Sequence, residues 1–230
     1  MNPKVFQAEL DAQVARYDLL AHPFYQSWSA GKLSHQHLRA YALEFFHLVA
    51  AFPTFLSSLH SRLHDGQLRR AVLRNLAEEE VEGRAYTDMW MDFAEGLGLS
   101  ANQVRRSHPS APLRQLIEQF YRSASQDSPA QVLAAIYAYA SQVPQVCGEN
   151  ARALLQHYGV DDRTCGYFVL HTYAGVRHAT VWRSELVRLL ERNEPMEAAA
   201  LESAGRAAEW LWQALDGCQA YRLSERSMTA

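Results

Sequence analysis

The chain has few of the features that mark a secreted or membrane-bound protein. No apolar run approaches the roughly 20 residues that cross a bilayer, and the N-terminus, MNPKVFQAELDAQVARYD, lacks the apolar core and cleavage site of a signal peptide. The three cysteines, Cys147, Cys165 and Cys218, are far apart and form no CxxC pair. Such thiols suit a reducing compartment better than a disulfide framework. We therefore expect a cytoplasmic protein.

Clustered basic charge is also absent. The formal net charge is -3, and the 22 basic residues form no block and no striped face. Nucleic acids and anionic membranes attract such clusters, so neither is an expected partner. A small molecule in the protein interior is the expected ligand, and a homodimer is the common default for soluble oligomers.

Strand signals and linkers are missing as well. Apolar residues instead recur at steps of three and four over long segments, which is typical of amphipathic helices. Turn-forming residues interrupt this pattern near residues 22, 34, 65, 98, 110, 128, 160 and 194, which predicts about seven helices. The sequence thus predicts one all-α domain over residues 1–230, with a short disordered tail at its C-terminal end.

Polar residues and prolines mark the expected helix ends. Six residues precede helical patterns and are predicted N-caps: Ser34, Asp65, Ser100, Ser128, Asp161 and Asn193. Pro129 and Pro195 suit a first helical turn, whereas Pro53 and Pro144 fall inside long patterns and predict kinks. His22, His47 and His60 are expected as capping or surface residues.

One carboxylate lies on an apolar stripe. Positions at helical spacing form one face of a predicted long helix: Val72, Leu76, Glu79, Gly83, Tyr86, Trp90, Phe93 and Leu97. Glu79 therefore points inward, while Glu78, Glu80 and Glu82 are expected on a solvated face. A buried carboxylate is costly unless it meets a cation or strong donors.

Two histidines lie on a second stripe, together with Phe168, Gly175 and Trp182. His171 and His178 are two turns apart, so both rings project from one side, roughly 10.5 Å apart along the axis. A histidine on an apolar face is ordinarily a satisfied core residue, but with Glu79 the pair makes the ligand set of a facial triad for non-heme iron. The stripe from Leu133 to Leu154 offers no ligand for a hard metal, which counts against a di-iron site.

Five segments follow one another between residues 20 and 185: HPFYQSWSAGKL, LRAYALEFFHLVAAFPTFLSSLHSR, NLAEEEVEGRAYTDMW, YAYASQVP and YFVLHTYAGVRHA. In sequence, order and spacing they resemble the CADD family of heme-oxygenase-like di-iron oxidases. This family shares its fold with PqqC and TenA. The resemblance implies a heme-oxygenase-like helical bundle. It also implies a site of six metal ligands, of which this chain keeps Glu79, His171 and His178.

The other three ligand positions hold Tyr86, Ala140 and Gly175. The resemblance thus implies either one Fe(II) or Mn(II), with Tyr86 as a fourth ligand or as a hydrogen-bond donor, or no metal. A full di-iron site is not expected. We expect water, a ligand or neighbouring aromatic rings in the space left at Ala140 and Gly175.

CADD relatives are linked to making p-aminobenzoate for folate from one of their own tyrosines, with a lysine as the amino donor. Tyr25 matches that tyrosine, and Asn150 stands at the lysine position. The resulting hypothesis is an oxidoreductase that uses dioxygen on a small aromatic or amino-acid-derived molecule, with Tyr25 and Tyr86 as catalytic candidates. The alternative is a non-catalytic paralogue that acts through protein contacts, for example by pairing with a relative that keeps all ligands. A TenA-like hydrolase is disfavoured, because no cysteine pairs with a base.

Overall fold

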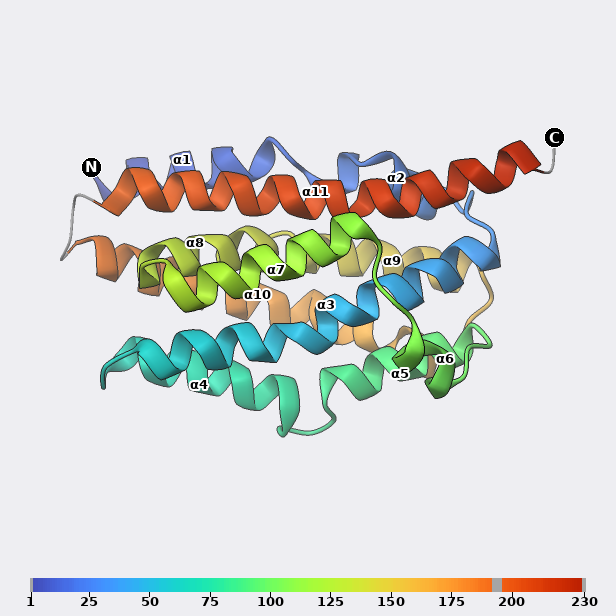
Figure 1. Ribbon diagram of the computed structural model, residues 1–230, viewed down its shortest axis with the longest axis horizontal. Coiled ribbons are helices and arrows are strands. Elements are labelled where there is room, and N and C mark those ends of the chain that lie inside the picture. Colours follow the sequence, from blue (N-terminus) through green and yellow to red (C-terminus); the bar gives the residue numbers. More distant parts are fainter. Residues whose placement is uncertain (1, 192–195, 229–230) are drawn as a thin grey trace.

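The all-α prediction is confirmed. The computed structural model describes residues 2–191 and 196–228, and every regular element within these ranges is a helix. In chain order the elements of Figure 1 are α1 (Pro3–Ala15), the 3-10 helix η1 (Leu19–Ala21), α2 (Pro23–Ser29), α3 (His35–Arg62), α4 (Gln67–Glu80), α5 (Tyr86–Gly96), α6 (Ala101–Arg106), α7 (Ala111–Gln126), α8 (Pro129–Ala140), α9 (Val143–His157), α10 (Asp162–Leu190) and α11 (Glu197–Met228).

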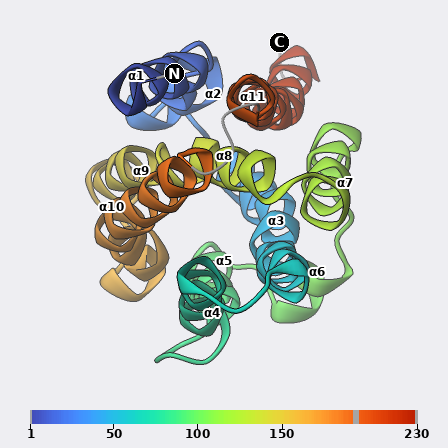
Figure 2. The ribbon, with the colours of Figure 1, turned by 90° about the vertical axis from the view of Figure 1, so that its left-hand side faces the viewer.

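The helices enclose one interior. Figure 2, viewed along the bundle, shows α1, α2 and α11 on one side and α4 and α5 on the opposite side, with α3, α8, α9 and α10 between them. Helix α10 packs against α5, α8 and α9, while α3 packs against α4, α5 and α7. Their facing apolar stripes form a continuous buried core. Residues far apart in the sequence therefore meet between α3, α4, α9 and α10.

Helix α3 corrects one expectation. It is long and apolar enough to cross a membrane by length and composition, although no such segment was expected. Half of its most apolar window is buried inside the bundle, and core helices of soluble proteins pass the same test. Pro53 lies inside this helix, which continues to Arg62.

Four of the predicted N-caps are confirmed. The side chains of Ser34, Ser100, Ser128 and Asp161 each accept a hydrogen bond from the backbone N–H three residues further on. The prediction for Asp65 is wrong, because Gly66, with a φ of 150°, precedes α4 and Asp65 pairs with Arg70 instead.

Several other predicted ends can be placed. His22 is a cap, as expected: its Nδ1 accepts from the Phe24 backbone N–H at 3.1 Å at the start of α2. Pro129 lies in the first turn of α8. Asn193 and Pro195 lie outside the described residues, and so do residues 229 and 230, where the tail was expected.

Two breaks divide segments that the sequence predicted as single helices. The first separates α4 from α5 at residues 81–85, where Gly83 has a φ of 79°. This conformation favours glycine, and Gly83 is exposed rather than inward-facing as predicted. The second separates α8 from α9 at residues 141 and 142, so Pro144 lies in the first turn of α9 and not at a kink. Prolines are well tolerated there, because those N–H groups have no helical partner.

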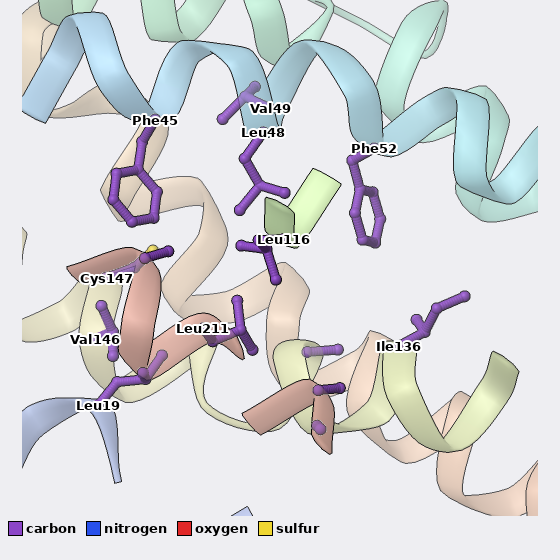
Figure 3. Packing of buried hydrophobic residues seen from close by; sticks show 14 of the residues in the cluster. Leu19, Phe45, Leu48, Val49, Phe52, Leu116, Ile136, Val146, Cys147 and Leu211 are labelled. Carbon is purple, nitrogen blue, oxygen red and sulfur yellow. The ribbon is translucent and has the colours of Figure 1, made fainter. Parts of the chain in front are cut away.

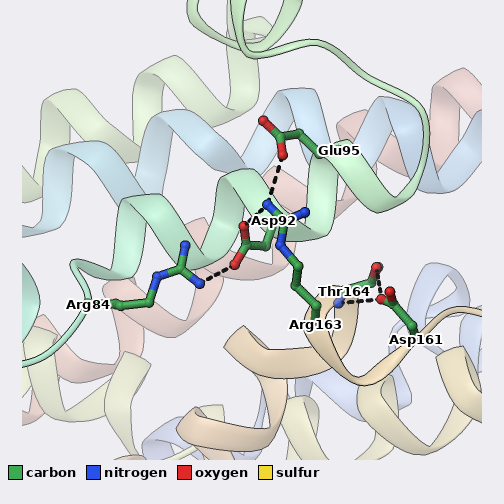
Figure 4. A network of polar contacts seen from close by, with 6 residues as sticks. All are labelled: Arg84, Asp92, Glu95, Asp161, Arg163 and Thr164. Carbon is green, nitrogen blue, oxygen red and sulfur yellow. Dashed lines mark hydrogen bonds and ion pairs between the residues drawn. The ribbon is translucent and has the colours of Figure 1, made fainter.

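A buried ion pair joins α5 to α10, and we call it the arginine clamp: Asp92 with Arg84 and Arg163 (Figure 4). Arg163 donates to Asp92 at 2.5 Å and to Glu95 at 3.0 Å. Asp92 is 5% exposed, and its hydrogen bonds with the two arginines lower the pKa of its carboxyl. The clamp joins α5 to the first turn of α10, the helix that carries His171 and His178.

Candidate functional site

The structure brings Glu79, His171 and His178 together. All three line one internal cavity of about 20 Å³ between α4 and α10, which we call the carboxylate–imidazole cavity. Asn75, Ala140, Gly175 and residues of α3 and α8 complete its wall. A volume of this size holds about one water-sized group. The predicted inward orientation of the two stripes thus places these donors around one small space, and their role as metal ligands remains a prediction.

Glu79 is a buried acid with no counterion among the described residues. It is 8% exposed, and no hydrogen bond or ion pair reaches its carboxyl group from residues 2–191 or 196–228. Burial, assisted by the nearby charges of Glu78 and Glu80, raises the pKa of Glu79 to about 8. A cation entering the cavity would compensate this carboxylate.

His171 is held in one tautomer. Its Nδ1 lies 2.8 Å from the Tyr167 carbonyl oxygen, which can only accept, so Nδ1 carries the proton and Nε2 keeps its lone pair. Burial lowers the pKa of His171 to about 4, so the ring is neutral at pH 7. Metal-bound histidines commonly donate their second nitrogen to a carbonyl in this way.

His178 is bound by Glu78. The His178 Nε2 donates to Glu78 Oε2 at 2.7 Å, and Arg177 donates to the same oxygen at 2.5 Å. Glu78 is therefore part of the site, which corrects its assignment to the solvated face; Glu80 and Glu82 make no such contact. Sequence spacing gave no signal for this, because Glu78 reaches His178 from the edge of α4 and not from its inward stripe.

The space expected at Gly175 is filled. A Cβ built there would lie 2.9 Å from Pro144 Cγ, 3.0 Å from Pro144 Cδ and 3.3 Å from Val143. In this direction the expectation of water, a ligand or aromatic rings at Gly175 is wrong, because the break before α9 brings Pro144 against α10. Gly175 and Ala140 both border the carboxylate–imidazole cavity, which Phe52 and Tyr139 also line.

Tyr86 lies beside the cavity and not among its lining residues. It is buried, and its ring meets the edge of His171 with a centroid separation of 4.5 Å. Burial and the charge of Glu79 raise the pKa of its phenol. The neutral phenol is therefore the stable form in the metal-free protein, which favours the hydrogen-bond donor over the phenolate ligand.

Tyr25 lines a second cavity, of about 40 Å³, which we call the tyrosine cavity. Its hydroxyl lies 2.8 Å from that of Tyr41, with both groups buried. Residues of α3, α9 and α11 close this space; Figure 3 shows Phe45, Leu48, Val49, Val146, Cys147 and Leu211 approaching it from these helices. Four residues border both cavities, so the two adjoin: Val49, Tyr139, Val143 and Tyr167.

The chemistry of these donors suits one divalent cation, although within the described residues they do not form a preassembled metal-binding cluster. A buried carboxylate without a described counterion and an imidazole with a free lone pair line the same small cavity. The His178 Nε2 is occupied by Glu78 and also lies 3.2 Å from Asn75 Nδ2. The donors do not fit two cations, because Ala140 and Gly175 supply no oxygen ligand and Pro144 occupies the room beside Gly175. Two divalent ions near one carboxylate would repel strongly.

Comparison with known proteins identifies relatives of this chain. A family model described as iron-containing redox enzyme matches residues 39–212. The chain is 37% identical over 206 residues to a 4-aminobenzoate synthase of Chlamydia pneumoniae, covering 90% of this chain and 91% of that protein. It is 30% identical over 227 residues to a 4-aminobenzoate synthase of Nitrosomonas europaea, covering 94% and 92%.

Solved structures share the fold at low sequence identity. A TenA homologue from Pseudomonas syringae superposes with a TM-score of 0.79 at 17% identity, covering 94% of this chain and 92% of that one. A CADD-like protein from Nostoc punctiforme gives a TM-score of 0.63 at 16% identity, covering 94% and 99%. The predicted heme-oxygenase-like fold and the resemblance to CADD are both confirmed, and the chain belongs to the heme-oxygenase-like family of iron-containing redox enzymes.

Proposed function

We propose that this protein is a dioxygen-dependent oxidoreductase that forms 4-aminobenzoate with the ring of its own Tyr25, assisted by a single Fe(II) or Mn(II). One observation carries the proposal: Tyr25 lines a cavity that adjoins the cavity of Glu79, His171 and His178. The printed names of relatives at 30 to 37% identity support the product.

Cavity size supports a ring that belongs to the protein. An apolar cavity of about 150 Å³ is needed to take up benzene in a well-studied case, whereas the tyrosine cavity measures about 40 Å³. An external aromatic molecule would have to displace several buried side chains. Tyr25 already places an aromatic ring at this position, so no such displacement is needed.

Each residue has a definable task. Glu79, His171 and His178 would hold the cation, which supplies the activation of dioxygen when bound. Tyr167 orients His171 through its carbonyl group, and Glu78 orients His178. Tyr41 fixes the Tyr25 hydroxyl by the hydrogen bond of 2.8 Å, and the apolar wall of α3 and α11 excludes bulk water from the ring.

The test is to supply the purified protein with Fe(II), a reductant and dioxygen, and to follow 4-aminobenzoate and the Tyr25 peptide by mass spectrometry. Protein grown with ring-labelled tyrosine should yield ring-labelled product and a mass change at Tyr25. Tyr25→Phe should yield none, while Tyr121→Phe, at an exposed position, should match the wild type. Unlabelled product, or product from Tyr25→Phe, would refute the proposal.

A second candidate is a non-catalytic paralogue that acts through protein contacts. The apolar packing of Pro144 against Gly175 favours it, because a degenerate site would fill in this manner. This second candidate predicts that the wild-type protein, supplied with Fe(II) as in the assay above, binds no metal and forms no 4-aminobenzoate.

A further inference from the structure

The side-chain amide of Asn150 is buried and unpaired. It is 1% exposed on α9, it lines the tyrosine cavity, and neither its Oδ1 nor its Nδ2 has a hydrogen-bond partner among the described residues. Buried side-chain amides are nearly always satisfied, so an exception in a cavity indicates a missing molecule. That molecule must offer an acceptor to Nδ2 and a donor to Oδ1.

The tyrosine cavity favours an uncharged molecule. No Asp, Glu, Lys, Arg or His is among its lining residues. Burial raises the pKa of Tyr25 and of Cys147, so the phenol and the thiol stay neutral. A charged ligand would therefore be desolvated without a counterion, and a volume of about 40 Å³ admits about three water-sized groups.

No lysine offers its amine to this space. The two lysines of the chain, Lys4 and Lys32, lie within the described residues, are both exposed and line neither cavity. If the product is 4-aminobenzoate, as proposed above, the amino nitrogen has to enter from outside. Asn150 is the polar group beside Tyr25 that has both a donor and an acceptor free for such a molecule.

We propose that Asn150 anchors a small, uncharged nitrogen compound in the tyrosine cavity, either ammonia or a primary amide no larger than formamide, and that ammonia bound there supplies the amino group. Ammonia accepts from Nδ2 through its lone pair and donates to Oδ1. In the exchange at the ring, a C–N bond forms and the phenolic C–O bond breaks. The hydroxyl leaves with one ammonia proton as water, so this step is redox-neutral.

Binding is tested on the metal-free, full-length protein with formamide as the probe. The side-chain NH₂ signal of Asn150, assigned by its absence in Asn150→Leu, should shift saturably in the wild type during a formamide titration followed by nuclear magnetic resonance. Acetate and benzamide should give no shift, because one is charged and the other too large. Asn102→Leu, at an exposed position, should behave as the wild type does.

The titration is followed in the wild type, and through-bond assignment identifies the Asn150 signal if Asn150→Leu does not fold, so the binding arm is decisive by itself. No saturable shift with formamide, or an equal shift with acetate, would overturn the proposal. In the product assay described above, ¹⁵N-ammonium at pH 9 should place ¹⁵N in more than nine-tenths of the 4-aminobenzoate. Unlabelled product would overturn the nitrogen source. Saturable formamide binding with no product at all would support the binding site and count against the proposed function.

Discussion

Asp92 and Glu79 are both buried carboxylates on neighbouring helices, and both face α10, yet their surroundings are opposite. Asp92 is paired with Arg84 and Arg163 in the arginine clamp, which lowers the pKa of its carboxyl (Figure 4). Glu79 has no cation among the described residues, and burial raises its pKa to about 8. The fold thus compensates the charge of Asp92 by itself, whereas no described residue compensates that of Glu79, and the cation proposed above would do so.

Removing the charge of Asp92 should have the largest effect on stability. Asp92→Asn removes the negative charge and one of the two acceptor oxygens that Arg84 and Arg163 share. We expect the free energy of unfolding to fall by about 2–4 kcal/mol, reduced from the value for a fully buried pair because both arginines are largely exposed. Urea denaturation measures this. Asp88→Asn, on the exposed side of α5, is the matched control and should change stability by less than about 0.5 kcal/mol. An equal loss of stability in Asp92→Asn and Asp88→Asn would show that the arginine clamp does not stabilise the fold.

Removing the charge of Glu79 should raise the free energy of unfolding, whereas removing that of Asp92 lowers it. The folded pKa of about 8 lies above the ordinary 4.5, so the unfolded chain loses its proton first and the wild type loses stability as the pH rises from about 4.5 to 8. In chelator-treated protein at pH 8.5, Glu79→Gln should be more stable by about 2–3 kcal/mol. Denaturation curves from pH 4 to 9 should show this pH dependence in the wild type and lose most of it in the variant. A destabilised Glu79→Gln at pH 8.5 would contradict the account.

The packing at Gly175 predicts that a restored ligand is not accommodated. Gly175→Asp forces its Cβ against the ring of Pro144, and overpacking of this kind costs about 1–3 kcal/mol. We expect a lower melting temperature and no gain in bound metal. Adding Pro144→Ala should recover part of the stability. If Gly175→Asp alone is as stable as the wild type, α9 can shift away from α10 at Pro144 without cost, which would contradict this prediction.

The smallest effect is expected at Glu78. Glu78→Gln keeps a hydrogen-bond acceptor for His178 but removes the charge that it shares with Arg177. We expect a change of stability below about 1 kcal/mol, with a several-fold weaker affinity for the cation, because the orientation of His178 is less well fixed. Urea denaturation measures the change in stability, titration calorimetry with Mn(II) measures the affinity, and Glu80→Gln is the control. An unchanged affinity for Mn(II) would show that Glu78 does not help to position His178 for the cation.

Much of the site could be predicted from helical spacing. The stripes that contain Glu79, His171 and His178 do converge on one cavity, because positions seven residues apart return to the same face of a helix. The caps at Ser34, Ser100, Ser128 and Asp161 followed from equally local chemistry. Local rules and the family motifs together were sufficient for the fold class and the inward residues.

What the sequence did not reveal depends on contacts between helices. The wedge of Pro144 against Gly175 requires the break after α8 and the packing of α9 on α10, neither of which a single-helix pattern contains. The bond from His178 to Glu78 crosses between α10 and α4. Whether the Asn150 amide is satisfied depends on every side chain around it, so its two free atoms become visible only in three dimensions.

Metal stoichiometry tests the central claim most directly. Wild type and Glu79→Gln, loaded identically with Fe(II) under anaerobic conditions and passed over a desalting column, should be compared by elemental analysis. We expect about one equivalent in the wild type and less than a tenth of that in Glu79→Gln. Two equivalents in the wild type, none in the wild type, or the same content in both proteins would contradict the claim that Glu79, His171 and His178 hold a single cation.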